Sequence, residues 1–167
     1  TAARWLNHQR ELYSQTLKRR SGLGLVGVMS AVLKCPNGSA LAVFKPNGIV
    51  DGGFDFIANS IGNRSAGGAT AQMGYVAIGT GSAAFVGSQT ALTTELVRQS
   101  ATYAHVAGTR IFTIETTFAA GIGTGAITEA GVFNASSAGT MLDRVVFSAI
   151  NKDAASPLTQ TFTFTLS

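Results

Sequence analysis

The sequence predicts a mainly β protein: an antiparallel, jelly-roll-like β-sandwich with one or two short helices and an N-terminal arm that is extended or helical. Two observations carry this prediction. Residues 158–167 alternate apolar and hydroxyl side chains with a period of two, with Gln160 as the one polar exception on the apolar side. This alternation is typical of a strand buried on one face. Twenty glycines and closely spaced turn residues separate the other apolar runs, as in all-β domains.

The composition suits one β domain, which we place at residues 23–167, preceded by a basic arm at 1–22. Charged residues make up 12% of the chain, about half the usual share. This low charge predicts that copies of the protein or partners cover much of its surface. Residues 1–50 hold seven of the 12 Lys and Arg residues and a single acid, so the basic charge belongs to the N-terminal third.

The residue pattern of the arm fits either a helix or an extended segment. Its apolar residues are spaced loosely like one side of a helix, and basic residues followed by Gly22 fit a helix C-terminus. An extended arm lying on a neighbouring subunit fits so short a pattern equally well. A solvated tail, or a helix packed on its own domain, is a further alternative. Three adjacent basic residues form only a small phosphate-binding patch, so nucleic acid is not the expected partner. The arm residues expected to contact a partner protein are Arg4, Trp5, Arg10, Tyr13, Lys18, Arg19 and Arg20.

Two strands are expected at 25–33 and 40–45, because the turn residues 35–39 between them contain Asn-Gly. A second turn is expected at 45–48. A short helix should follow over 51–62, with Asp51 as its cap and Gly62 as its stop. The residues that this helix is expected to bury are Phe54, Ile57, Ala58 and Ile61.

The remaining elements are short strands and tight connections. A strand is expected at 73–78, a glycine-rich loop at 79–82, and one helical turn at 90–96 capped by Thr90. Further strands are expected at 98–106, 109–118, 126–134, 140–150 and 158–167. Their connections are expected to be a two-residue turn at 107–108, a hairpin connection at 121–125 and small-residue turns at 135–139 and 151–157.

The sequence contains no motif that predicts enzymatic chemistry. No lysine follows Gly79-Thr80-Gly81-Ser82 as in a P-loop, and the third glycine of a dinucleotide fingerprint is missing. Two histidines and one cysteine do not support a zinc site, and no Asp/Asn-rich loop supports calcium. We therefore expect a non-enzyme with no cofactor, no catalytic residues and no metal site. No apolar run is long enough to predict a membrane span.

Glu129 and Arg144 fall on strands that are expected to follow one another along the chain. Opposite charges on neighbouring antiparallel strands pair across the sheet. We therefore predict a structural ion pair between these two residues.

Three stretches resemble structural proteins of tailed-bacteriophage virions: Y-V-A-I-G-T-G at 75–81, A-L-T-T-E-L-V-R at 91–98 and I-T-E-A-G-V-F-N at 127–134. The run Met141-Leu142-Asp143-Arg144 and the Leu/Thr-rich final strand extend the likeness, which covers about residues 73–167. The segment T-E-A-G-V-F-N is similar to one in tail-collar fibre proteins and related virion β proteins.

The resemblance implies a homo-oligomeric structural protein of a virion, assembled in the host cytoplasm. The preferred version is a capsid decoration or cement protein that binds and stabilises the shell of major capsid protein through its β domain and basic arm. One alternative is a tail-associated protein, such as a collar, baseplate or fibre-attachment component. Another is a glycan-binding module on the virion surface.

Overall fold

The computed structural model describes residues 24–62 and 72–166, so the predicted arm at 1–22 lies outside the described residues. Most of the described residues lie in strands, and the described ranges contain one helix. Each strand pair is antiparallel. The prediction of a mainly β, antiparallel fold is confirmed.

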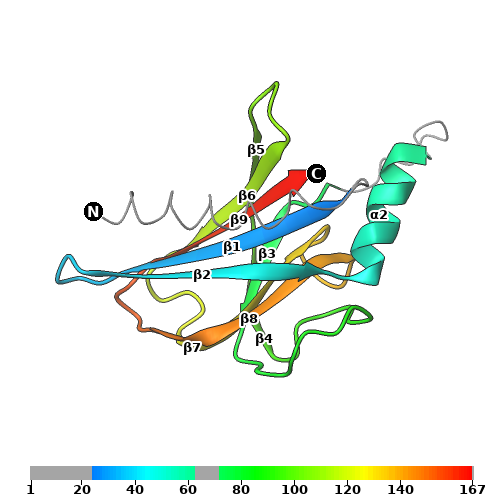
Figure 1. Cartoon of the computed structure of the whole chain (residues 1–167). Helices are drawn as coiled ribbons and strands as arrows, with labels where there is room; N and C mark the ends of the chain where they lie inside the picture. Colours follow the sequence, from blue (N-terminus) through cyan, green and yellow to red (C-terminus); the bar gives the residue numbers. More distant parts are fainter. Residues whose placement is uncertain (1–23, 63–71, 167) are drawn as a thin grey trace.

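The described strands form one nine-stranded sheet in the order β4-β3-β7-β8-β2-β1-β9-β6-β5. This sheet curls until β3 and β4 contact β6, so it is nearly closed into a barrel (Figure 1). The jelly-roll-like sandwich stays a prediction. The elements are β1 (Leu25–Lys34), β2 (Ala40–Ile49), α2 (Asp51–Gly62), β3 (Tyr75–Gly79), β4 (Glu95–Ser100), β5 (Thr102–His105), β6 (Ile111–Phe118), β7 (Gly125–Phe133), β8 (Met141–Lys152) and β9 (Leu158–Leu166).

The final strand, β9, lies between β1 and β6; it pairs with β1 along its whole length and with β6 over 158–165. Phe162 and Phe164 on one side are fully buried, while the threonines on the other side are half-buried. Gln160, the polar exception in the pattern, is also fully buried. The alternation of the last residues therefore predicts both the strand and its inner face correctly.

The main core fills the inside of the curled sheet. Its buried residues come from β1, β3, β6, β7, β8 and β9 and include Met29, Ile78, Ile114, Ile127, Val145 and Phe162. A second, smaller cluster contains Val50, Ala77, Leu92, Phe133 and Met141. Because this cluster includes Leu92 from the loop between β3 and β4, that loop covers part of β3 and β7.

The turn predicted at 45–48 is wrong. β2 continues through these residues to Ile49, with Lys45 opposite Met29 and Pro46 opposite Val28. Pro46 is tolerated because β2 pairs with β8 only at Gly48 and Ile49, which leaves the other edge of β2 outside a ladder at Pro46.

Helix α2 has the predicted bounds, but its cap and one of its buried positions differ. The Val50 carbonyl accepts the amide of Phe54 at 3.2 Å, so Val50 is the cap residue and Asp51 lies in the first turn. Phe54 is 50% exposed, because Gly53 is the residue that packs closely against the backbone of Leu142. Ile57 is half-buried, and the side chains of Ala58 and Ile61 lie outside the described residues.

Some of the predicted connections between strands are confirmed and others are wrong. The turns at 35–39 and 135–139 are confirmed as hairpin connections. The hairpin predicted around 107–108 also forms, but its connection runs over 106–110 and is longer than the two residues predicted. The segment 121–125 is not a hairpin, because β6 and β7 are not neighbours in the sheet. The strand predicted at 98–106 is divided at Ala101 into β4 and β5, which lie at opposite ends of the strand order.

Candidate functional site

The three stretches on which the predicted resemblance to virion proteins depends lie side by side in the structure. β3, which carries the first stretch, pairs with β4 on one side and with β7 on the other. The second stretch leads into β4, and the third forms most of β7. The likeness therefore concerns one compact unit of the fold rather than three separate segments.

The structure brings Glu129 of β7 and Arg144 of β8 together. Arg144 donates from Nη2 and Nε to Glu129 Oε2 at 2.7 and 2.9 Å, and both side chains are fully buried. Glu129 lies opposite Val146, whereas Arg144 lies opposite Gly131, so the two side chains meet diagonally across the strand pair.

The Glu129 carboxylate also holds the loop between β3 and β4. Oε1 accepts the backbone amides of Gly81 at 3.0 Å and Thr94 at 2.7 Å, and Oε2 accepts the amide of Thr93 at 3.0 Å. A side chain at Gly81 would collide with this carboxylate. The helical turn predicted at 90–96 is wrong because these amides bond to Glu129 instead of to a preceding turn.

Arg144 contacts a second part of the same loop. Nη1 donates to the Ala83 carbonyl at 3.0 Å and to Gln89 Oε1 at 3.1 Å, while Nη2 donates to Thr93 Oγ1 at 3.0 Å. Glu129 and Arg144 together therefore bind the loop over 80–94 near both of its ends and in its middle. We call these two side chains and their loop contacts the Glu129–Arg144 clamp.

Burial and hydrogen bonding shift the pKa of Glu129 in opposite directions. Burial raises its pKa, but hydrogen bonds from the Thr94 and Thr93 amides and from Arg144 outweigh burial, so its pKa lies below the usual value. The carboxylate is therefore ionised at neutral pH, although it is shielded from solvent. With five hydrogen bonds to its two oxygens, it has the contacts of a structural anchor rather than of an accessible acid or base.

Asp143 of β8 is a second fully buried carboxyl group. It accepts the Val132 amide at 3.0 Å and contacts the Asn47 side-chain amide. Burial raises the pKa of Asp143 well above its usual value, and the Val132 hydrogen bond opposes this shift only in part. Across residues 24–62 and 72–166, no three His, Cys, Asp or Glu side chains gather closely enough to hold a metal ion.

An apolar groove of about 690 Å³ opens on the surface of the described residues. Its lining residues place it between α2, the helix at the right of Figure 1, and one end of the curled sheet. Its lining residues are Gly24, Leu25, Phe54, Phe56, Ile57, Gln72, Met73, Tyr103, Phe112, Ile114, Leu142 and Leu166. Tyr103 and Phe112 lie along one side with ring centroids 5.8 Å apart, and Phe112 stacks at 4.9 Å on Phe164, which is buried behind it.

No sequence pattern could identify this groove, because its residues come from α2, from five strands and from the segments that connect them. The exposure of Phe54 is its clearest local sign, yet the sequence predicts that residue to be buried. The predicted partner-binding residues Arg4, Trp5, Arg10, Tyr13, Lys18, Arg19 and Arg20 all lie outside the described residues.

Comparison with known protein families, curated proteins and solved structures finds no match to this chain. The likeness to virion proteins therefore depends on the short stretches at 75–81, 91–98 and 127–134 and on the residues that extend them. The helix that the structure describes is neither long nor apolar enough to cross a bilayer.

Proposed function

We propose that this protein is a non-enzymatic structural protein of a tailed-phage virion, and specifically a decoration or cement protein bound to the capsid shell. The observation that carries the proposal is the apolar groove with its exposed rim, in which Phe54 is 50% and Tyr103 48% exposed. Apolar surfaces of this kind are typical of docking sites for protein partners. A jelly-roll-like arrangement of the sheet is the finer fold that we attach to this proposal.

The Glu129–Arg144 clamp supports a binding role over a catalytic one. A buried ion pair is strongly destabilised when one partner is lost, so its two charges serve to hold the loop over 80–94 in place. The carboxylate has no free lone pair directed at solvent, and it therefore offers no group to a substrate. This loop presents Phe85 and Val86, which are 40% and 55% exposed, as a second apolar contact surface.

The basic arm supplies the second half of the proposed interaction. Its cations would meet an acidic surface of the major capsid protein, which contributes orientation and association rate more than affinity. Repeated contacts by an oligomer then add avidity. The proposed binding is therefore partly apolar, through the groove, and partly salt-dependent, through the arm.

Binding of the full chain to virions that lack it tests the proposal. Replacing Tyr103→Ser at the groove rim should weaken saturable binding by about tenfold or more, as expected for an aromatic hot spot. The matched control is Ile122→Ser, an exposed apolar position outside both the groove and the loop over 80–94. Wild-type binding by the Tyr103 variant, or no saturable binding by the unmodified protein, would overturn the proposal.

The copy number per particle distinguishes a capsid decoration protein from a tail-associated protein. A decoration protein should be present in copies on the order of hundreds per particle, as measured by gel densitometry of purified virions. A much lower count would favour the alternative of a tail-associated component. That alternative has one specific support, the similarity of T-E-A-G-V-F-N, now the centre of β7, to tail-collar fibre proteins.

A further inference from the structure

The two strands at the ends of the sheet order, β4 and β5, differ in how their outer edges are protected. β4 carries Glu95 and Arg98, and it contacts β6 where the curled sheet nearly closes. Charged side chains and cover from a neighbouring element are common means by which an edge strand avoids pairing with another chain. β5, with the sequence Thr-Tyr-Ala-His, contains no Lys, Arg, Asp, Glu or Pro. The edge of β5 is therefore the less protected of the two.

The edge of β5 is also accessible. In the described part of the chain, β6 is the one strand that pairs with β5. All four residues of β5 are exposed, and the β5–β6 hairpin projects beyond the rest of the sheet (Figure 1). In an antiparallel pair, alternate residues direct their backbone N–H and C=O groups away from the partner strand. Backbone groups of β5 thus point to the side opposite β6, where a further strand has room to pair.

Exposed apolar side chains accompany this edge. Tyr103 of β5 is 48% exposed, and Val106, which directly follows β5, is 70% exposed. Ile111 at the start of β6 and Leu166 at the end of β9 are exposed as well. A strand added beside β5 would therefore cover apolar surface in addition to forming backbone hydrogen bonds, which is how sheet edges commonly bind a partner.

We propose that β5 pairs antiparallel with β5 of a second copy of this chain, so that the two sheets join across a two-fold axis. Two-fold dimers are the commonest homo-oligomers, and they use the same surface patch on both subunits. A second copy suits this edge because β5 carries no Lys, Arg, Asp or Glu that would face the same charge in the copy. The inference concerns self-association and does not depend on the proposed function.

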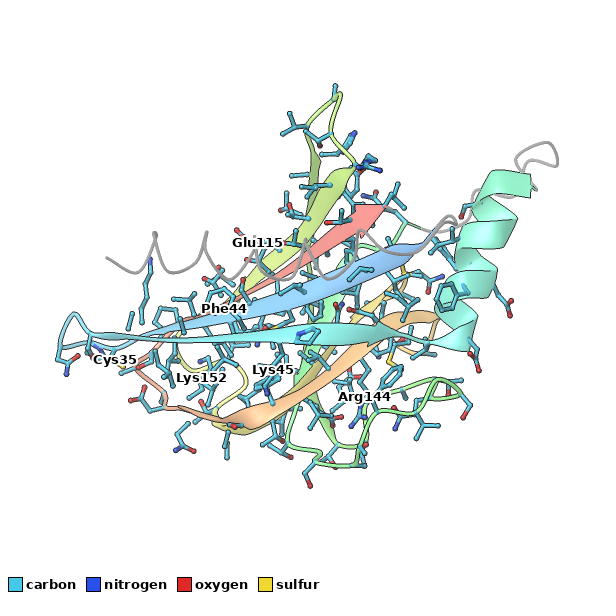
Figure 2. The ribbon with its side chains drawn as sticks, viewed as in Figure 1. Cys35, Phe44, Lys45, Glu115, Arg144 and Lys152 are labelled. Atoms are coloured by element: carbon cyan, nitrogen blue, oxygen red, sulfur yellow. The ribbon has the colours of Figure 1, made fainter. Side chains whose placement is uncertain are left out.

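Charges near β5 stay far apart in such a dimer. Glu115 of β6, labelled in Figure 2, lies opposite Thr102 and is one strand further from the axis. Three strand spacings, about 14 Å, then separate the strands that carry the two Glu115 side chains, which exceeds the screening length of about 8 Å at physiological salt. The two Arg110 side chains lie at opposite ends of the pair, because the hairpins run in opposite directions.

The alternation of side chains restricts the register of this pairing. Tyr103 and His105 lie on one face of β5, and Thr102 and Ala104 lie on the other. Directly opposite residues share a face, and a two-fold axis perpendicular to the sheet keeps each face on its own side. The axis must therefore pass beside a residue that faces its own copy, which is either Tyr103 or Ala104 at the centre of the strand.

The surroundings of β5 favour Ala104 as this central residue. Centring on Tyr103 would extend the ladder toward Ala101, whose amide already donates to the Gly74 carbonyl at 2.8 Å. Centring on Ala104 extends the ladder toward Val106, which then lies opposite Thr102 of the second copy. Because Val106 is the more exposed apolar side chain, the second register covers more apolar surface. The pairing that we assign therefore centres on Ala104.

Sedimentation equilibrium of the full chain tests this dimer. Ala104→Lys and Ala104→Glu each place two like charges face to face, so each should raise the dimer Kd by about tenfold or more. An equimolar mixture of these two variants should associate again, because opposite charges then face each other. The matched control is Ile122→Lys, at an exposed position in the connection between β6 and β7, and it should associate like the unmodified protein. Circular dichroism verifies that the variants keep their strands.

Disulfide trapping tests the register. Cys35, the one cysteine of the chain, lies at the β1–β2 turn, well away from the β5–β6 hairpin (Figure 2), and Cys35→Ser removes it from the assay. In that background, Ala104→Cys should form a covalent dimer under mild oxidation. The reason is that Cα atoms of directly opposite residues are about 4.5–5.5 Å apart, within the range that a disulfide spans. Ile122→Cys in the same background should stay monomeric on a non-reducing gel.

Four results would overturn the proposal. An unmodified chain that is monomeric up to about 100 μM would leave the β5 edge to a strand of another protein. A dimer that Ala104→Lys does not weaken would use a different surface. A mixture of the Lys and Glu variants that stays monomeric would show that residue 104 does not face its copy, as would cross-linking of Ala104→Cys no faster than that of Ile122→Cys. Because Ala104 does not line the groove, each of these results leaves the proposed function to its own virion-binding test.

Discussion

The substitution Glu129→Gln should strongly destabilise the protein, because it leaves a buried positive charge unpaired. Glutamine keeps the size of the side chain but removes its charge, so the buried guanidinium of Arg144 loses its counter-ion. Breaking one side of a buried ion pair costs about 3–5 kcal/mol. The three backbone amides that bond to the carboxylate would also lose part of their acceptor capacity.

Urea denaturation of the two proteins measures this cost as a shift of the midpoint at constant slope. A loss of 3–5 kcal/mol corresponds to at least about a hundredfold change in the folded-to-unfolded ratio. The matched control is Glu95→Gln, because Glu95 forms a 2.7 Å ion pair with Arg98 and its side chain is 30% exposed. That substitution should cost at most about 1 kcal/mol.

The effect of Glu129 should also depend on pH in a defined direction. Its folded pKa lies below the usual 4.5, so its stabilisation is present above about that pH and is lost as pH falls through the folded pKa. Glu129→Gln should therefore flatten the loss of stability in acid. Hydrogen exchange at the Gly81, Thr93 and Thr94 amides should accelerate in the same variant. If Glu129→Gln costs no more than Glu95→Gln, the clamp does not anchor the loop.

Three further substitutions follow from the same contacts. Asp143→Asn keeps an acceptor for the backbone amide that Asp143 binds, and it removes a buried acid. Because the pKa of Asp143 is raised, its ionisation destabilises the folded protein as pH rises. Thermal melts at neutral pH should therefore show equal or higher stability for the variant. Gly81→Ala should cost about 1–3 kcal/mol in urea denaturation, because its methyl group would collide with Glu129, whereas Gly74→Ala should be nearly neutral. Arg98→Lys should cost about 1–2 kcal/mol in the same assay, because lysine lacks the planar fork that reaches two carbonyls and stacks 3.6 Å from an aromatic ring centroid.

Each of these expectations has a clear contrary result. A large drop in melting temperature for Asp143→Asn at neutral pH would mean that the ionised carboxylate stabilises the fold. Equal stability of the Gly81 and Gly74 variants would show that the loop adjusts freely around Glu129. If Arg98→Lys has the same stability as the unmodified protein, the ring contact and the hydrogen bonds to the two carbonyls do not stabilise the fold.

The strands and their hairpins could be predicted because they depend on local properties. The alternation in 158–167 follows from the two-residue repeat of an extended backbone, and Asn-Gly at 37–38 follows from the backbone angles of a tight turn. Gly38 indeed has a positive φ of 83°. Helix α2 was predictable within its bounds for the same reason, since its stop and apolar spacing lie in one short segment.

Predictions failed where contacts with residues far away in the chain determine a segment's conformation more strongly than its own residues do. The turn expected at 45–48 is strand because β1 offers a continuous partner. The helical turn expected at 90–96 does not form because its amides donate hydrogen bonds to a carboxylate more than thirty positions away. Phe54 is exposed because the close approach of β8 to Gly53 decides which face of α2 is covered. None of these partners can be inferred from neighbouring residues.

The amino-acid sequence by itself therefore determines the class of this fold, the position of most strands and the two charged residues that pair across β7 and β8. The order of strands in the sheet, the loop that the Glu129–Arg144 clamp holds and the apolar groove are decided only by the tertiary structure. The physical reason is that backbone periodicity acts over a few residues, whereas these features assemble side chains from strands that are far apart in the chain.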